Sequence, residues 1–318
     1  MTQPPRIISL LPSATEIVFA LGLDEALVGV THECDFPPAA RTKRAVTKSY
    51  IPDGSDSATI DHLVSEHQGR LYAVDEAALA DLQPTVILTQ RLCDVCAVPY
   101  DEVAAVAERL DPQPLLVNLE PNTLEDVVAS IEQVAQAVGA PERAEPVVAA
   151  LQARIEAIRV GAWGGTRRPR VVCLEWADPP FCAGHWVPGM VELAGGVEAL
   201  GAPGVDSQRV TWEQVVAAQL EVVVCMFCGF DVPRSLDDVR QLAQRPEWNG
   251  LLAVQHGEVW VTHGSAYFSR PGPRLVDGLE LLSQIFHPEV FPRQFTDQQA
   301  VRFASAAEPA LATPARGR

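Results

Sequence analysis

The sequence predicts an α/β protein made of two Rossmann-like lobes, which a single long α-helix joins and between which a ligand cleft lies. Short apolar strands alternate with helices both before residue 123 and after residue 168, and this alternation is typical of parallel sheets covered by helices. The intervening segment, 123–168, has helical periodicity followed by a break that contains glycine and arginine. Its longest apolar stripe covers about 141–160, which is therefore the predicted bridging helix.

The first lobe is predicted to span 1–122. Its strands are short apolar runs bounded by proline, glycine or polar residues, and they are expected at 7–11, 27–30, 85–89 and 115–117. Ser13 and Glu16 fit a capping box, so we expect Ser13 to cap a helix that ends at Gly22. A further helix is expected over 99–110.

The second lobe is predicted to span 169–290. It repeats the alternation, with strands at 170–174, 220–227 and 257–261 and helices at 187–195, 236–245 and 273–286. The remaining segment, 291–318, is a C-terminal tail whose end is rich in alanine and proline, so we expect the tail to be partly disordered.

The charge balance and the apolar runs exclude some classes of protein. Asp and Glu number 41 against 24 Lys and Arg, and the resulting net charge of −17 predicts no nucleic-acid partner. No apolar run approaches the ~18–20 residues of a membrane span, so a membrane-inserted protein is not expected. The start of the sequence lacks the residue order of a secretion signal. The predicted location is therefore the cytoplasm, with the seven cysteines present as reduced thiols.

Aromatic and polar residues follow the predicted strands at their carboxyl ends, where open parallel sheets bind ligands. The candidate ligand-binding residues are Ser13, His32, Glu175, Trp176, His185, Trp186, Cys228, Gly229, Phe230, Tyr267, Phe268 and Arg270. Aromatic faces with a few polar groups suit a large, flat ligand. Simpler roles remain open: Ser13 as a helix cap, His185 as a structural histidine, and Arg270 in a salt bridge within its lobe rather than on a ligand carboxylate or amide.

A second candidate site consists of cysteine and histidine. The set is His32, Cys34, Cys93 and Cys96, which together would suit a tetrahedral zinc, or an iron, if the two loops meet. An extended loop would point His32 and Cys34 the same way. The alternative is a solvated histidine with half-buried thiols. Cys93 or Cys96 with His32 would also suit a nucleophile and its base.

The sequence contains none of the common catalytic or nucleotide-binding motifs. It has no G-x-S-x-G, no H-E-x-x-H, no P-loop and no G-x-G-x-x-G after a strand. We therefore identify no catalytic residue, and a binding protein is favoured over an enzyme.

Several segments in this order resemble a known family. They are 6–16, 20–22, 28–31, 35–38, 80–87, 212–215, 257–260 and 274–279, so the resemblance covers roughly residues 6 to 288. Together they are similar to the helical-backbone substrate-binding proteins that serve transporters for vitamin B12, siderophores and haem. The His32–Cys34 loop, 93–96 and 228–230 most resemble the cytoplasmic branch labelled cobalamin-binding protein.

The resemblance implies non-catalytic binding of cobalamin, another corrinoid or a related metal chelate between the lobes. It also implies one carboxylate on each lobe that docks on a membrane permease. Glu213 occupies the second-lobe position, whereas Ala77 stands at the first-lobe position with Asp75 and Glu76 just before it. The alternative function is a cytoplasmic enzyme or metal sensor that uses the cysteine and histidine site.

Overall fold

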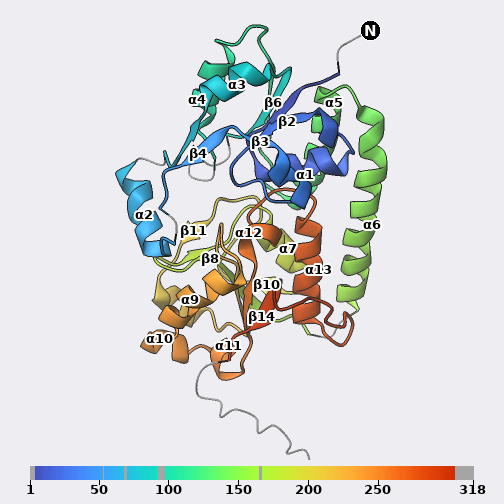
Figure 1. The fold of residues 1–318 in the computed structure, drawn as a ribbon. Coiled ribbons are helices and arrows are strands. Elements are labelled where there is room, and N and C mark those ends of the chain that lie inside the picture. The colour runs from blue at the N-terminus through green and yellow to red at the C-terminus, as the bar shows by residue number, and fades with distance from the viewer. Residues whose placement is uncertain (1–3, 53, 68–69, 92–96, 165–166, 305–318) are drawn as a thin grey trace, which may run out of the picture.

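The computed structural model confirms the predicted α/β architecture of two lobes. The structure describes residues 4–52, 54–67, 70–91, 97–164 and 167–304. In Figure 1 the lobes lie one above the other, and the long helix α6 (Ala144–Trp163) runs along one side of both. None of the helices in these ranges combines the length and apolar character that a membrane span requires.

The N-terminal lobe is built on a five-stranded parallel sheet. Its strands are β1 (Ile7–Ser9), β2 (Leu27–Val30), β3 (Arg44–Ala45), β6 (Val86–Thr89) and β7 (Leu115–Asn118), in the order β3-β2-β1-β6-β7. Helices α1 (Pro12–Ala20) and α5 (Leu124–Ala137) cover one face, and α3 (Glu76–Leu82) and α4 (Tyr100–Ala107) the other. Short 3-10 turns occupy Asp24–Ala26 and Pro38–Thr42. The apolar runs of β1 and β6 thus become central strands that are buried on both faces, whereas Leu115 of the edge strand β7 is exposed.

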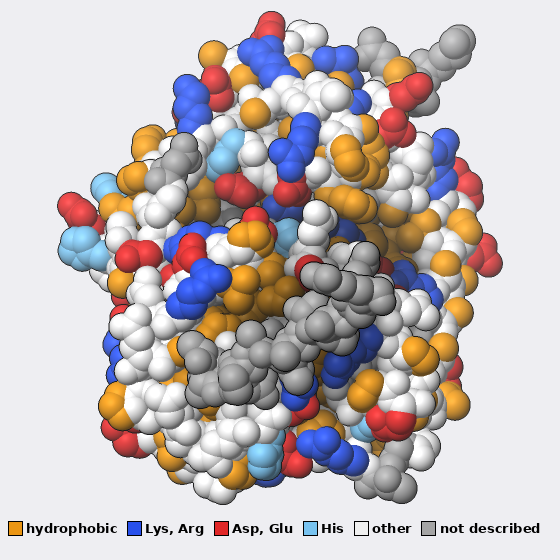
Figure 2. All heavy atoms as spheres, turned by 60° about the horizontal axis from the view of Figure 1, so that its bottom comes forward, with side chains coloured by type: hydrophobic (Ala, Val, Ile, Leu, Met, Phe, Trp, Pro, Cys, Tyr) orange, Lys and Arg blue, Asp and Glu red, His pale blue; other side chains and the backbone are white. Residues whose placement is uncertain are grey.

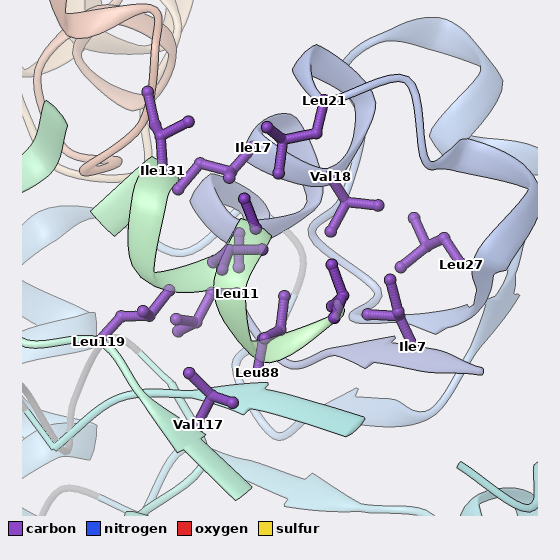
Figure 3. Packing of buried hydrophobic residues seen from close by; sticks show 14 of the residues in the cluster. Ile7, Leu11, Ile17, Val18, Leu21, Leu27, Leu88, Val117, Leu119 and Ile131 are labelled. Carbon is purple, nitrogen blue, oxygen red and sulfur yellow. The ribbon is translucent and has the colours of Figure 1, made fainter. Parts of the chain in front are cut away.

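The core of this lobe lies between the sheet and α1 with α5. Figure 3 shows Ile7 and Leu88 of the sheet packing toward Ile17 of α1, with Ile131 of α5 nearby. All four side chains are fully buried. Each core side chain of this size contributes about 1.5–3 kcal/mol through burial, which fixes α1 over the carboxyl end of β1.

An insertion that the sequence did not predict extends this lobe. Strands β4 (Thr47–Ser49) and β5 (Tyr72–Val74) pair antiparallel, and α2 (Ser57–Glu66) lies between them in the chain. Arg234 of the second lobe donates a hydrogen bond of 2.9 Å to the carbonyl oxygen of Ser55. The insertion therefore reaches across to the other lobe.

The C-terminal lobe contains a seven-stranded mixed sheet. Its parallel centre is β8 (Arg170–Trp176), β12 (Val222–Cys225) and β13 (Val259–Thr262), and β10 (Val197–Glu198) also pairs with β8. Antiparallel edges are supplied by β9 (Phe181–Cys182), β11 (Gln208–Arg209) and β14 (Ala300–Arg302). Strand β14 falls inside the segment that was expected to be a tail.

Helices cover both faces of this second sheet. The apolar cluster on one face includes residues of α6, α7 (Val187–Leu193) and α13 (Leu275–Phe286). The opposite face carries α8 (Trp212–Ala217), α9 (Val232–Leu242), α10 (Pro246–Asn249) and α11 (Leu252–Gln255). The short α12 (Gly264–Tyr267) follows β13. Both lobes are thus three-layered.

The bridging helix belongs to the cores of both lobes. A 3-10 turn at Pro141–Arg143 precedes α6, whose Leu151 joins the N-terminal core and whose Ile158 joins the C-terminal core. Between them, Arg154 pairs with Asp277 at 2.5 Å and with Glu280 at 2.8 Å, both on α13. Because α6 packs into the core of each lobe, it is a rigid connection that limits how the lobes can move relative to each other.

The predicted capping box at Ser13 and Glu16 does not form. Helix α1 begins at Pro12, and Leu11 at the N-cap offers no side-chain cap. Proline tolerates this position because the first helical N–H needs no partner in the helix. Glu16 instead turns toward the second lobe, where it pairs with Arg274.

Candidate functional site

Two adjoining hollows lie at the carboxyl ends of the strands in the described part of the chain. The outer hollow, of about 510 Å³, is lined by both lobes, and the inner chamber, of about 290 Å³, lies mainly in the C-terminal lobe. They share Gln90, Cys228, Ser269 and Pro271. Figure 2 shows hydrophobic side chains in a hollowed part of one face, bordered by basic and acidic ones. The hollows together form the cleft that the sheets predict.

The outer hollow presents flat rings from both lobes. In the N-terminal lobe His32 and Tyr72 lie with ring centroids 5.4 Å apart, and in the C-terminal lobe Trp176 and Phe230 lie 5.5 Å apart. The guanidinium of Arg234 sits 4.4 Å from the centroid of the Phe230 ring. Two ring surfaces on opposite walls suit a planar ligand held between them.

His32 is held by the insertion hairpin. The hydroxyl oxygen of Thr47 on β4 lies 3.1 Å from the His32 backbone nitrogen and 2.7 Å from Nδ1. The Nε2 atom lies 3.5 Å from a carboxylate oxygen of Glu33. Burial lowers the pKa of His32, and Glu33 opposes that shift. His32 therefore stands at the cleft as a neutral imidazole, the form that binds metals.

Cys34 does not accompany His32 into the cleft. Its N–H donates to the carbonyl oxygen of Thr31 at 3.2 Å, so this part of the loop is a turn and not the extended segment that was expected. The Cys34 sulfur is buried, 3.1 Å from the Thr15 hydroxyl and 3.3 Å from the Thr31 hydroxyl. Burial raises the pKa of this thiol. Cys34 is thus a core side chain of the N-terminal lobe.

The predicted metal set is only partly visible. Cys93 and Cys96 lie outside the described residues, so their proximity to His32 stays a prediction. Within the described ranges, no group of three histidine, cysteine or acidic side chains is arranged to hold a metal ion.

The inner chamber contains five of the predicted ligand-binding residues: Glu175, His185, Trp186, Cys228 and Phe268. Glu175 is the second-last residue of β8, and burial raises its pKa to about 7, while a hydrogen bond from Ser207 opposes the rise. His185 has a left-handed backbone, with φ of 51°. Its buried Nδ1 hydrogen-bonds to nothing in the described chain. Within the described chain, the chamber is therefore mainly apolar, with a buried carboxyl and one buried nitrogen that has no hydrogen-bond partner.

Arg270 pairs across the cleft. It lies 2.5 Å from a carboxylate oxygen of Asp35 in the N-terminal lobe, and it donates to the carbonyl oxygen of Glu33 at 3.2 Å. The hydrogen bond to Asp35 and the charge of Arg270 lower the pKa of Asp35, against the rise that burial causes. The alternative prediction of a salt bridge within one lobe is wrong, because the partner belongs to the other lobe.

Most predicted ligand-binding residues line one of the two hollows. The outer hollow includes Ser13, His32, Trp176, Cys228, Gly229, Phe230 and Arg270. Tyr267 is absent from the lining of both, and its ring stands 6.0 Å from that of His263.

The lining residues that sequence reasoning missed include Gln90, Tyr72, Ser207 and Arg234. Gln90 directly follows β6, so the strand-end rule would have found it. The other three lie in segments whose place relative to the cleft depends on tertiary packing.

The fold and the cleft define a two-lobe ligand-binding protein. The chain belongs to the periplasmic binding protein family, whose model matches residues 7–266. It is 24% identical over 282 residues to a vitamin B12-binding protein of Vibrio cholerae, covering 86% of each chain. It is also 24% identical to YvrC of Bacillus subtilis, an uncharacterized ABC transporter substrate-binding lipoprotein, over 91% of this chain and 82% of that one.

A solved structure shows the same fold. The periplasmic heme-binding protein RhuT from Roseiflexus sp. RS-1, in apo form, superposes with a TM-score of 0.69 at 24% identity. The superposition covers 91% of this chain and 100% of the RhuT chain.

The predicted cytoplasmic location is wrong. The matching family is described as periplasmic, and the Bacillus relative is a lipoprotein. These findings point to a place outside the cytoplasm, and they do not support membership of a cytoplasmic branch. The prediction depended on the residues before β1 alone, and neither the lobes nor the cleft depends on the compartment.

Proposed function

We propose that the protein binds a corrinoid of the cobalamin type in the cleft, without chemical change, and presents it outside the cytoplasm to the permease of an ABC transporter. The observation that carries this proposal is that each lobe contributes a pair of aromatic rings to the lining of the outer hollow. The names of the Vibrio and Bacillus relatives agree with such a ligand and such a partner. A planar cobalt chelate would stack against both walls and bury them from water.

Docking on the permease is proposed to use one carboxylate from each lobe. Glu213 is exposed in the first turn of α8. In the other lobe Glu76 is exposed and pairs with Arg109 at 2.8 Å, whereas Asp75 caps α3 by accepting from the Ala78 N–H at 3.0 Å. Glu76 is therefore the better candidate of the two, since a surface ion pair exchanges its partner at little cost.

The proposal is tested by titrating the reduced, metal-free protein with cobalamin while the visible spectrum is recorded. We expect saturable binding with a dissociation constant of about 1 μM or tighter, with a spectral shift. Metal analysis of the protein as purified accompanies the titration. Absence of binding together with about one tightly held zinc or iron per chain would favour the second candidate, a metal site that uses His32, Cys93 and Cys96.

We expect His32→Ala to change the visible spectrum of the bound corrinoid, because His32 lines the outer hollow and is proposed as a nitrogen ligand of the cobalt. The matched control is His62→Ala on α2, since that side chain is 80% exposed. A bound spectrum identical to that of the wild type would remove His32 from the metal ligands. His185→Ala, measured in the same way, tests the other predicted histidine.

A further inference from the structure

The described part of the cleft has no unpaired cation. Its two lining arginines are Arg270, which pairs with Asp35 at 2.5 Å, and Arg234, which pairs with the buried carboxylate of Asp238 at 3.2 Å. Both guanidinium groups also donate to carbonyl oxygens of the N-terminal lobe. A ligand carboxylate that entered the cleft would have to compete with these protein carboxylates for its counter-ion.

Among the described residues, by contrast, one acidic side chain of the cleft, Glu175, has no basic partner. Glu175 is surrounded by the protein, yet part of its side chain opens into the inner chamber. Its chamber neighbours include the apolar side chains of Trp186, Met226 and Phe268. The other ionisable side chains that line this chamber are His185, Asp206 and Cys228, and none of them is a fixed cation.

A buried carboxyl without a cation is stabilised by N–H donors, and a second carboxylate beside it is repelled. Ser207 supplies one hydroxyl donor to Glu175. The inner chamber, with a volume of about 290 Å³, leaves room for a ligand group beside Glu175. The buried Nδ1 of His185, which also lines the chamber, has no hydrogen-bond partner in the described chain.

We infer that the inner chamber is a subsite for an uncharged N–H group of the ligand, such as a primary amide, and that Glu175 makes the cleft select chelates with an amide periphery over chelates with a carboxylate periphery. This inference rests on the proposed function and adds the chemical class that the cleft accepts. The selection has an attractive part, the N–H donated to Glu175, and a repulsive part, the unpaired charge against a carboxylate.

Two corrinoids that share the cobalt and the ring provide the test. Cobinamide carries amides around the ring, whereas cobyrinic acid carries carboxylates at the same positions. The dissociation constant of each is measured by visible titration at pH 7.5 for the wild type and for Glu175→Gln. We expect the wild type to prefer cobinamide at least tenfold, and Glu175→Gln to reduce that preference by about tenfold, because a charged acceptor becomes a neutral one.

Asp178→Asn is the control, because it removes one exposed charge from the loop after β8 and lies outside both hollows. It should leave the preference unchanged. If Glu175→Gln does not fold, Ser207→Ala takes its place, with a smaller reduction expected. An unchanged preference in the folded Glu175 or Ser207 variant would overturn the inference while leaving corrinoid binding intact. A wild type that binds neither corrinoid would overturn the proposed function and this inference with it.

Discussion

Replacement of Arg274 by alanine is expected to lower the free energy of unfolding by about 3–5 kcal/mol. The Arg274 guanidinium holds the Glu16 carboxylate from two sides, at 2.5 and 3.0 Å, and their side chains are only 12% and 3% exposed. Burial raises the pKa of Glu16, and the hydrogen bond and charge of Arg274 oppose that rise. Without Arg274, the buried carboxyl would lose both of its hydrogen bonds to that guanidinium and would keep only the more distant Arg270, whose Nη1 lies 3.9 Å from Glu16 Oε1. Urea unfolding of the wild type and the variant measures the loss.

The matched control is Arg159→Ala. Arg159 also holds a glutamate from two sides, Glu156 at 2.6 and 2.7 Å, but that pair lies on the exposed face of α6. Its removal should leave the unfolding free energy nearly unchanged. The double variant Glu16→Gln with Arg274→Met should recover much of the loss, because it removes both charges of this buried pair. Equal losses for Arg274→Ala and Arg159→Ala would contradict the prediction.

This ion pair also limits how far the lobes can separate. Arg274 stands at the start of α13 in the C-terminal lobe, and Glu16 lies on α1 in the N-terminal lobe. Gly272 lies so close to α1 that a Cβ atom there would come within 3.3 Å of the Ser13 backbone. Opening the lobes widely would break this buried ion pair, so the cleft is expected to admit its ligand with small movements.

The second large effect is a loss of stability as the pH rises. Burial raises the pKa of both Glu175 and Glu198 to about 7, against the usual 4.5. Hydrogen bonds from Ser207 to Glu175, and from the N–H groups of residues 199–201 to Glu198, oppose the rise. A folded-state pKa above the unfolded one means that the folded chain binds more protons between the two values. The stabilisation is therefore full below about pH 4.5 and is lost as the pH passes through about 7.

Each of these two carboxyls is expected to cost ~3 kcal/mol of stability between pH 4.5 and 8. Urea unfolding between pH 5 and pH 8 measures how steeply the free energy of unfolding falls with pH. Glu198→Gln should remove about half of the fall that Glu175 and Glu198 cause together. The glutamine keeps an oxygen for the three N–H groups, so the variant is expected to fold. A slope that is the same in the wild type and in Glu198→Gln would show that this carboxyl is ionised in the folded protein at low cost.

Much of the fold could be predicted because periodicity and breakers are local properties. The predicted strand 27–30 is β2 itself, and the predicted bridging helix at about 141–160 corresponds to α6, which spans Ala144–Trp163. The insertion that carries β4, α2 and β5 was missed. Helix α2 of this insertion buries little of its surface, so its sequence has no clear apolar stripe. Its two short strands are stabilised by pairing with each other across the intervening helix, which local sequence patterns do not show.

The candidate site could be predicted in part for the same reason. The order of strands places Glu175, Trp176 and Cys228 at the same edge of a sheet, and the sequence therefore indicates them as neighbours. The spacing of His32 and Cys34 could not show that a turn sends one side chain to the cleft and the other into the core. The spacing of Ser13 and Glu16 likewise fits a cap, whereas the second lobe supplies a stronger partner.

The sequence by itself determined the two α/β lobes, the bridging helix and the aromatic and polar residues at the strand ends, because alternating apolar runs and helix breakers act over a few residues at a time. The tertiary structure alone decided which charges remain in the cleft. Asp35 and Arg270 are 235 residues apart and Glu16 and Arg274 are 258 apart, so their pairing depends on how the lobes face each other. Among the described residues Arg270 pairs with Asp35, Arg274 pairs with Glu16, and no cation pairs with Glu175. These pairings depend on tertiary structure because a buried ion pair forms only where the fold brings both partners out of water together.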